Sequence, residues 1–135
     1  MGTHNYFYIS NKKKNGIAAY SFVRSSPKYL IEILDKVGIA SKIQKLPLTI
    51  YTPISNELDD YGTSFSGGET QKILLARSLA NTKLINIYDE VSNALDVESK
   101  KDAVKLIRKY NKNTITIVVS HDNEWNDYVD QIVKL

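Results

Sequence analysis

The sequence contains no cysteine, no internal repeat and no long apolar run. The absence of cysteine excludes disulfide bonds and thiolate metal sites. No apolar run approaches the roughly 20 residues that a membrane-spanning helix needs, and the first residues lack the apolar core of a secretory signal. With 42% hydrophobic and 24% charged residues, the composition is that of a soluble globular protein. We therefore expect a cytosolic protein.

The excess of positive over negative charge is also small, since the net charge is +3 over 135 residues. The densest basic run, Lys12-Lys13-Lys14, lies between Asn11 and the pair Asn15-Gly16. Beside such turn-forming residues, this run is more simply a solvated turn than a nucleic-acid patch. We expect no nucleic-acid partner, and the length predicts about one domain.

The N-terminal part of the chain changes character at Pro27. Residues 6–10 and 17–23 are rich in aromatic and β-branched residues, and the Asn15-Gly16 pair between them favours a turn, so a β-hairpin is one prediction for this part. From Pro27 an apolar stripe predicts a helix that stops at Gly38. A short helical piece over residues 41–45 and an ordered loop over residues 46–64 are expected to follow.

The second half of the chain alternates between helical and strand patterns. Helices are predicted over residues 69–80 and from the cap Asp96 to about residue 110, with a last helical turn near residues 123–128. Strands are predicted over residues 84–88, 114–120 and 131–135. The segment 114–120 is apolar or β-branched on both faces, which is typical of a parallel strand covered on both sides. This alternation predicts an α/β layer with a parallel sheet.

Three polar side chains follow the predicted strands directly, namely Asp89, Glu90 and His121. In parallel α/β sheets, ligands bind beyond the carboxyl ends of the strands. Two acids there can be surface or capping residues, and a lone histidine is often structural. They can also divide catalytic work: Asp89 would hold Mg²⁺, Glu90 would polarise a water for attack on a phosphoryl group, and His121 would contact a terminal phosphate.

The stretch "TSFSGGETQKILLARSLA" at residues 63–80 has two interpretations. Ser66 followed three residues later by Glu69 forms a capping box, so the stretch marks the start of a helix. The glycines Gly67 and Gly68 also leave backbone N–H groups and the positive end of the helix dipole open to an anion such as phosphate. The two interpretations are compatible, because the cap would build the anion-binding surface.

The order of these segments resembles the ATP-binding-cassette (ABC) ATPase family. Residues 65–69 are similar to its signature loop, although the usual Leu is Phe65 and the usual Gln is Glu69. Residues 84–89 resemble the Walker B strand, whose last residue, Asp89, would bind magnesium. Glu90 matches the catalytic base, residues 92–96 resemble the D-loop, and His121 matches the switch histidine.

The resemblance covers about residues 27–135 and implies a partial P-loop-NTPase-like ATPase core with parallel strands plus an α-helical subdomain. Residues 27–80 would form the helical subdomain, which is similar to that of exporters over residues 29–47. Residues 81–135 would form part of the α/β core, and residues 1–26 stay unassigned. The implied location is cytoplasmic, peripheral on the inner face of the cell membrane when assembled.

The family's cofactors are ATP and Mg²⁺. The resemblance implies that residues of the signature loop and the D-loop bind the nucleotide, namely Ser66, Gly67, Gly68, Glu69, Ser92 and Asp96. The family's signature loop caps the γ-phosphate of ATP held by an opposing domain in a head-to-tail dimer. The implied partners are therefore a second nucleotide-binding domain and, through the helical subdomain, the transmembrane domain of a transporter.

Two motifs of the family are missing from the 135 residues. The phosphate loop G-x-x-x-x-G-K-[ST] does not occur, since Gly62 and Gly67 have its spacing but Gly68 stands where Lys is needed. Residues 1–27 contain no Gln for the Q-loop. We therefore expect an incomplete sheet with an edge that could pair with another chain. The chain alone should neither bind ATP tightly nor hydrolyse it, and the Glu69 carboxylate should repel a nearby triphosphate.

Three functions fit these observations. The first is a part of the ATP-binding and ATP-hydrolysing subunit of an ABC transporter, of exporter type. The second is a non-catalytic interaction module that uses residues 30–48. The third is a fragment of a DNA-repair or chromosome-type ABC ATPase. The sequence argues against it, because it lacks a basic stripe with interleaved aromatic residues.

Overall fold

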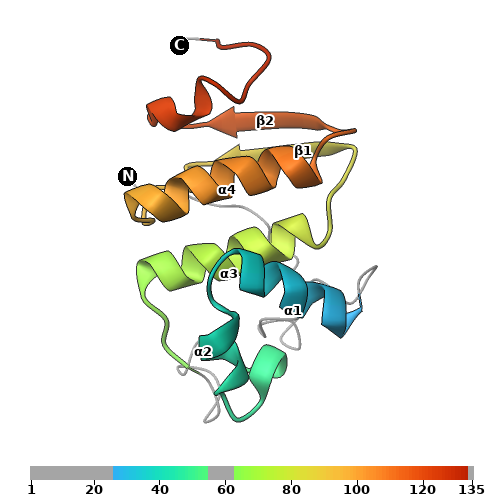
Figure 1. The fold of residues 1–135 in the computed structure, drawn as a ribbon, viewed down its shortest axis with the longest axis vertical. Coiled ribbons are helices and arrows are strands. Elements are labelled where there is room, and N and C mark those ends of the chain that lie inside the picture. The colour runs from blue at the N-terminus through green and yellow to red at the C-terminus, as the bar shows by residue number, and fades with distance from the viewer. Residues whose placement is uncertain (1–25, 55–62, 134–135) are drawn as a thin grey trace.

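The computed structural model describes residues 26–54 and 63–133 of the chain. Its helices are α1 (Pro27–Lys36), α2 (Ala40–Gln44), α3 (Gly67–Leu79) and α4 (Val97–Tyr110), its 3₁₀ turns are η2 (Thr49–Tyr51) and η3 (Asn123–Trp125), and its strands are β1 (Ile85–Asp89) and β2 (Ile115–Val119). Figure 1 shows α1 and α2 gathered away from the strands, with α3 and α4 between them. The predicted hairpin lies outside the described residues. Within the described ranges, no helix is long and apolar enough to cross a bilayer.

Helix α1 forms where its capping residues and apolar stripe predict it. The Ser26 side chain accepts a hydrogen bond from the Tyr29 N–H, and Pro27 occupies the first turn, where its missing N–H costs nothing. The helix ends shortly before Gly38, whose φ of 75° is a left-handed conformation that suits glycine. The prediction for this segment is confirmed, and α2 begins one residue earlier than expected.

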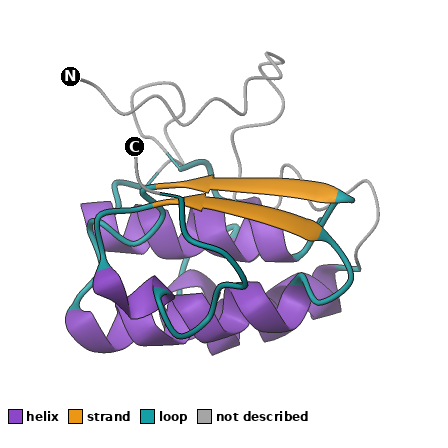
Figure 2. Ribbon diagram, turned by 90° about the horizontal axis from the view of Figure 1, so that it is seen from above, coloured by secondary structure: helices purple, strands orange, loops and turns teal. Residues whose placement is uncertain are grey.

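The two strands are parallel and in register from Ile85 opposite Ile115 to Asp89 opposite Val119. Helix α4 connects them, as a parallel pair requires. Figure 2 shows the helices gathered on one side of the strands. The side chains that face the helices include Tyr88, which is 4% exposed. The parallel α/β layer predicted from the alternating pattern is therefore confirmed.

The other face of the strand pair departs from the prediction. Its apolar side chains are between 47% and 63% exposed, and we call them the open face: Ile85, Ile87, Ile115, Ile117 and Val119. The prediction that residues 114–120 are covered on both sides is thus wrong for the described part of the structure. The physical reason is that the described helices all lie on the opposite side of the strands.

A polar contact joins the helical layer to β1. The Tyr88 hydroxyl accepts hydrogen bonds from Ser78 of α3 at 3.2 Å and from the Asn111 side chain, just after α4, at 3.0 Å. The apolar core around it includes Leu30, Ile33, Ile73, Leu79, Val104 and Ile107. This contact fixes how α3 and α4 approach the strand that carries Asp89 and Glu90.

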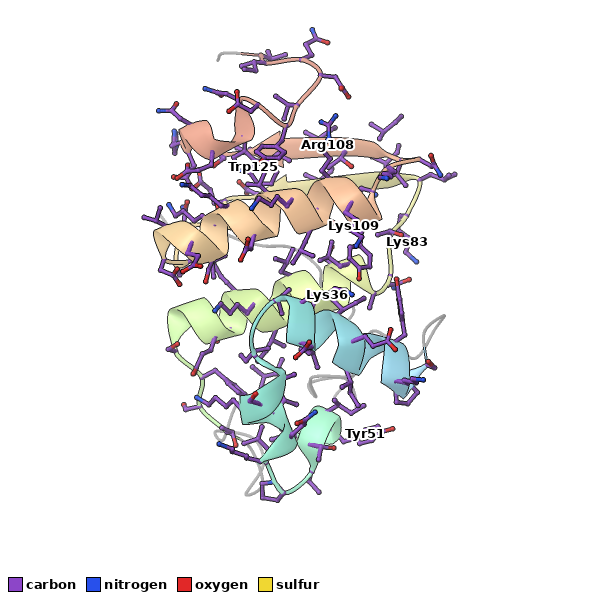
Figure 3. All side chains as sticks on the ribbon, viewed as in Figure 1. Lys36, Tyr51, Lys83, Arg108, Lys109 and Trp125 are labelled. Carbon is purple, nitrogen blue, oxygen red and sulfur yellow. The ribbon has the colours of Figure 1, made fainter. Side chains whose placement is uncertain are left out.

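The segment after β2 differs from its prediction in one respect. Residues 123–125 form η3, in agreement with the expected helical turn, and Trp125 packs there against α4 (Figure 3). The expected strand over residues 131–135 is absent from its described part, residues 131–133, which are exposed and extend away from the sheet. An alternating apolar pattern predicts a strand only where a neighbouring strand offers hydrogen-bond partners.

Candidate functional site

The signature-like loop opens helix α3 through the predicted capping box. The Ser66 hydroxyl accepts from the Glu69 N–H at 3.2 Å, and the Glu69 carboxylate accepts from the Ser66 N–H at 2.9 Å. Helix α3 therefore begins at Gly67, two residues earlier than predicted. The N–H groups of Gly67 and Gly68 donate to no other described residue. Both stay available, at the positive end of a 13-residue helix, for an anion.

The carboxylate of Glu69 is neutralised within the chain. The Lys42 ammonium lies 2.7 Å from both Glu69 carboxylate oxygens and 5.3 Å from the centre of the Phe65 ring. Hydrogen bonds from Lys42 and from the Ser66 backbone hold the pKa of Glu69 below its usual range. The repulsion expected between Glu69 and an anion at Gly67 and Gly68 is therefore offset by Lys42.

Glu90 and His121, predicted from strand ends, lie together at the carboxyl edge of the sheet. Glu90 Oε1 is 3.4 Å from His121 Nε2, and the two side chains are 12% and 96% exposed. The Glu90 N–H donates to the Val119 carbonyl at 2.9 Å. Glu90 has a φ of 50°, a left-handed conformation that is uncommon for a residue with a side chain. Strain of this kind is frequent at functional sites.

The second carboxylate oxygen of Glu90 is buried without a hydrogen-bond partner in the described structure. Leaving such an oxygen unsatisfied is costly, so a polar ligand or a water is expected beside it. A carboxylate with one oxygen near an imidazole and one oxygen without a partner is suited to accept a proton from a water bound beside it.

Asp89 ends β1 as an exposed residue on the same side of the sheet as Ile87. The described residues contain no group of three or more His, Cys, Asp or Glu side chains that could hold a metal. Proteins usually bind Mg²⁺ through one or two carboxylate oxygens while waters and substrate phosphates complete the shell. Asp89 can supply that oxygen, so the residues present fit a magnesium ion that arrives with a nucleotide.

The residues that resemble a D-loop have partners of their own within the chain. Ser92, 1% exposed, donates to Asp122 at 2.9 Å, and Lys100 of α4 lies 2.9 Å from the other Asp122 oxygen. Lys100 lowers the pKa of Asp122 through this contact, and Asp122 raises the pKa of Lys100. Asp96 caps α4 by accepting from the Ser99 N–H at 3.0 Å.

Sequence reasoning missed three residues at this edge. Asp122, in the turn after β2, accepts from Ser92 in the turn after β1 and from Lys100 of α4. The strand-end rule could have included Asp122 because it directly follows His121. Gln71 of α3 contacts the turn after β1 through both ends of its amide. A polar residue inside a helix carries no sequence signal that distinguishes such a contact from a solvated position.

Curated relatives match most of this chain but little of their own length. The chain is 36% identical over 104 residues to the macrolide export ATP-binding/permease protein MacB of Bdellovibrio bacteriovorus, covering 76% of the chain and 14% of that protein. It is 32% identical over 110 residues to the ATP-dependent lipid A-core flippase of Francisella tularensis, covering 82% and 17% respectively. It is also 34% identical over 83 residues to an uncharacterized ABC transporter ATP-binding protein of Methanocaldococcus jannaschii, covering 61% and 37%.

A solved structure of a bacterial Atm1-family ABC exporter with ATP bound matches the fold. The TM-score is 0.67 at 24% identity, and the match covers 85% of this chain and 20% of that one. No family model matches the sequence. The relatives and the shared fold confirm the resemblance drawn from the motifs. This chain belongs to the ATP-binding-cassette family.

Proposed function

We propose that this chain supplies part of an ATP-hydrolysing site in an ABC transporter of exporter type. The observation that carries the proposal is the position of Glu90 at the carboxyl edge of the sheet. One of its oxygens lies 3.4 Å from His121, and the other is buried without a partner among the described residues. In this role Glu90 polarises the attacking water, His121 contacts the terminal phosphate, and Asp89 holds Mg²⁺. When bound, Mg²⁺ would neutralise charge on the phosphate oxygens.

The phosphate-cradling loop of this site comes from outside the 135 residues, because the sequence contains no such motif. Much of the stabilisation in phosphoryl transfer comes from the backbone and lysine of that loop. The chain alone therefore carries the residues that activate water but lacks the loop that binds the triphosphate. The open face supports this view, since it offers apolar surface to the missing segment. So do the outer edges of β1 and β2, which pair with no other described strand.

The signature loop serves a different nucleotide, held by an opposing domain in a head-to-tail dimer. Two observations support this role. The N–H groups of Gly67 and Gly68 have no partner in the described part of the chain, and Lys42 neutralises Glu69. Ser66, whose hydroxyl accepts from Glu69, can still donate its own proton to a phosphate oxygen. Ser92 and Asp96, in the D-loop, would contact nucleotide between this chain's own site and the site of the opposing domain.

The same proposal assigns partners and location. Residues 27–80 form the helical subdomain that docks on the transmembrane domain, and residues 81–135 belong to the ATPase core. The assembled protein lies on the inner face of the cell membrane. The names of the MacB and lipid A flippase relatives support an export function for the whole transporter.

A calorimetric titration of the purified chain with Mg²⁺-ATP tests the first part of the proposal. We expect no binding up to millimolar ATP and no turnover above that of Glu90→Gln. Micromolar binding that disappears in Ser66→Ala would contradict the proposal, because it would mean that this chain builds a complete nucleotide site without a phosphate loop.

A mixing experiment tests the second part. An isolated ATP-binding domain of the MacB relative, with its own signature serine replaced by alanine, is combined with this chain. We expect the chain to raise ATP turnover by that domain, Ser66→Ala to abolish the effect, and Glu90→Gln to preserve it, since Glu90 serves the other site. Equal activation by the parent chain and by Ser66→Ala would contradict the role of the signature loop.

A further inference from the structure

Gln71 bonds to the turn that follows β1, which we call the 90–95 turn after its residues. It lies one turn into α3, half buried, and its side-chain oxygen accepts from the Ala94 N–H at 2.9 Å. Its amide nitrogen lies 3.4 Å from the Glu90 carbonyl oxygen, at the long end of a hydrogen bond. Only this orientation of the amide satisfies both contacts, because one requires an acceptor and the other a donor. Gln71 therefore joins both ends of the 90–95 turn to the signature helix.

The N-terminus of α3 can reach the 90–95 turn because two glycines face it. A Cβ atom on Gly68 would lie 2.8 Å from the Ala94 carbonyl oxygen, closer than real Cβ contacts come. A Cβ atom on Gly67 would lie 3.5 Å from the Ala94 Cβ, at ordinary contact distance. The signature loop and the 90–95 turn are therefore packed backbone against backbone.

The 90–95 turn determines where the Glu90 carboxylate lies. Glu90 is held in its left-handed conformation by its N–H bond to Val119 and by two donors to its carbonyl, the Asn93 N–H at 3.2 Å and Gln71. Without Gln71, the carbonyl keeps only the donor within its own turn. A rotation of the Glu90 backbone would carry the Glu90 carboxylate away from His121, because the side chain moves with the backbone to which it is attached.

We propose that Gln71 is a positioning residue that couples the signature loop to the Glu90 carboxylate. A displacement of α3 at Gly67 and Gly68, such as an anion there would cause, passes through the Gln71 amide to the backbone of residues 90–94. This inference rests on the proposed function only for the role of Glu90 in catalysis. The mechanical coupling itself is tested without nucleotide.

The absence of cysteine from the chain allows a direct test of the packing. In a Gly67→Cys/Ala94→Cys variant the two Cβ atoms are expected near 3.5 Å, within the range that a disulfide spans. We expect rapid disulfide formation in this background and roughly threefold to tenfold slower formation when Gln71→Ala is added, from the loss of its hydrogen bonds. Leu74→Ala, on the exposed side of the same helix, is the matched control and should leave the rate unchanged.

Hydrogen exchange of the Ala94 amide separates the two ends of the Gln71 side chain. Gln71→Ala removes the acceptor and should accelerate exchange about threefold to tenfold. Gln71→Glu keeps an acceptor oxygen and should preserve the protection of Ala94. The Tm of each variant is recorded to show that it is folded. Unchanged crosslinking and exchange in a folded Gln71→Ala variant would overturn the proposal, as would equal effects of Gln71→Ala and Gln71→Glu on Ala94.

The His121 ring reports whether the effect reaches Glu90. Its Nε2 resonance is measured at pH 8.5. Glu90→Gln should shift this resonance, Gln71→Ala should move it toward the Glu90→Gln value, and Leu74→Ala should not move it. A resonance that Gln71→Ala leaves in place would overturn the link to Glu90. Failure of the ATP mixing experiment would not alter these three readouts, so the two proposals can fail separately.

Discussion

The Lys42 ammonium lies 2.7 Å from both carboxylate oxygens of Glu69, across 27 positions of sequence. This ion pair connects α2 to the capping box of α3, so it links α2 to the loop proposed to contact phosphate. Because both side chains are partly exposed, at 42% and 31%, the pair is screened by solvent and salt. Its main effect is to cancel the charge of Glu69 beside the helix N-terminus.

We expect Lys42→Ala to lower the free energy of unfolding by at most about 1 kcal/mol at pH 7 and to reduce the loss of stability in acid. The pKa of Glu69 is lowered in the folded state, so its contribution is present above the unfolded value of about 4.3 and is lost as pH falls through the folded value. Urea unfolding at pH 7, 4 and 3 measures both effects. Lys45→Ala is the control, and an equal acid response in both variants would contradict the ion pair.

Substitution of the two glycines should have opposite effects on stability. Gly68→Ala places a methyl group 2.8 Å from the Ala94 carbonyl oxygen, which should cost about 1 to 3 kcal/mol through overpacking. Gly67→Ala meets only an ordinary contact at 3.5 Å and lies in the first turn of α3, so it should be neutral or stabilising by up to about 1 kcal/mol. Denaturant unfolding at pH 7 measures both, and equal destabilisation would argue against the close packing of α3 on the 90–95 turn.

Tyr88→Phe should destabilise the chain by about 1 to 2 kcal/mol, because it removes the acceptor for Ser78 and for the buried Asn111 side chain. Tyr29→Phe is a matched control, since Tyr29 is 38% exposed. Thermal and urea unfolding of both variants measure the difference. A Tyr88→Phe variant as stable as the parent would show that Asn111 finds another partner.

The open face should make the isolated chain associate. Exposed apolar patches of this kind mark interaction surfaces or aggregation sites. Ile115→Thr/Ile117→Thr keeps β-branched residues in β2 while making the face more polar, so we expect less self-association and less binding of an apolar dye. Light scattering over a range of concentrations measures the association. Association that is unchanged in this variant would direct attention to the free strand edges instead.

Most helices and the parallel pairing were predictable from the sequence because their causes are local. Capping residues at Ser66 and Asp96 and the apolar stripe of α1 act within a few residues of the elements that they define. The convergence of Glu90 and His121 followed from the strand-end rule alone. These features depend on local sequence patterns, so they do not require knowledge of which segments pack against them.

The remaining features depend on contacts between distant segments. The Lys42 to Glu69 pair spans 27 positions and the Gln71 to Ala94 contact spans 23, and neither leaves a periodic signal. The burial of β2 was mispredicted because an apolar face indicates what a strand can bury, whereas the neighbouring elements decide what it does bury. The strand expected at residues 131–135 depended in the same way on a partner strand.

The position of Asp89 on the open face would link assembly to the proposed metal binding. The carboxylate stands at the end of the row formed by Ile85 and Ile87, so a segment that covers these side chains also encloses the oxygen proposed for Mg²⁺. Burial of the apolar row and completion of the ion's shell then become one thermodynamic event. A ligand that binds only the covered state stabilises it by mass action, and Mg²⁺-nucleotide would therefore tighten the association of this chain with a segment that covers the open face.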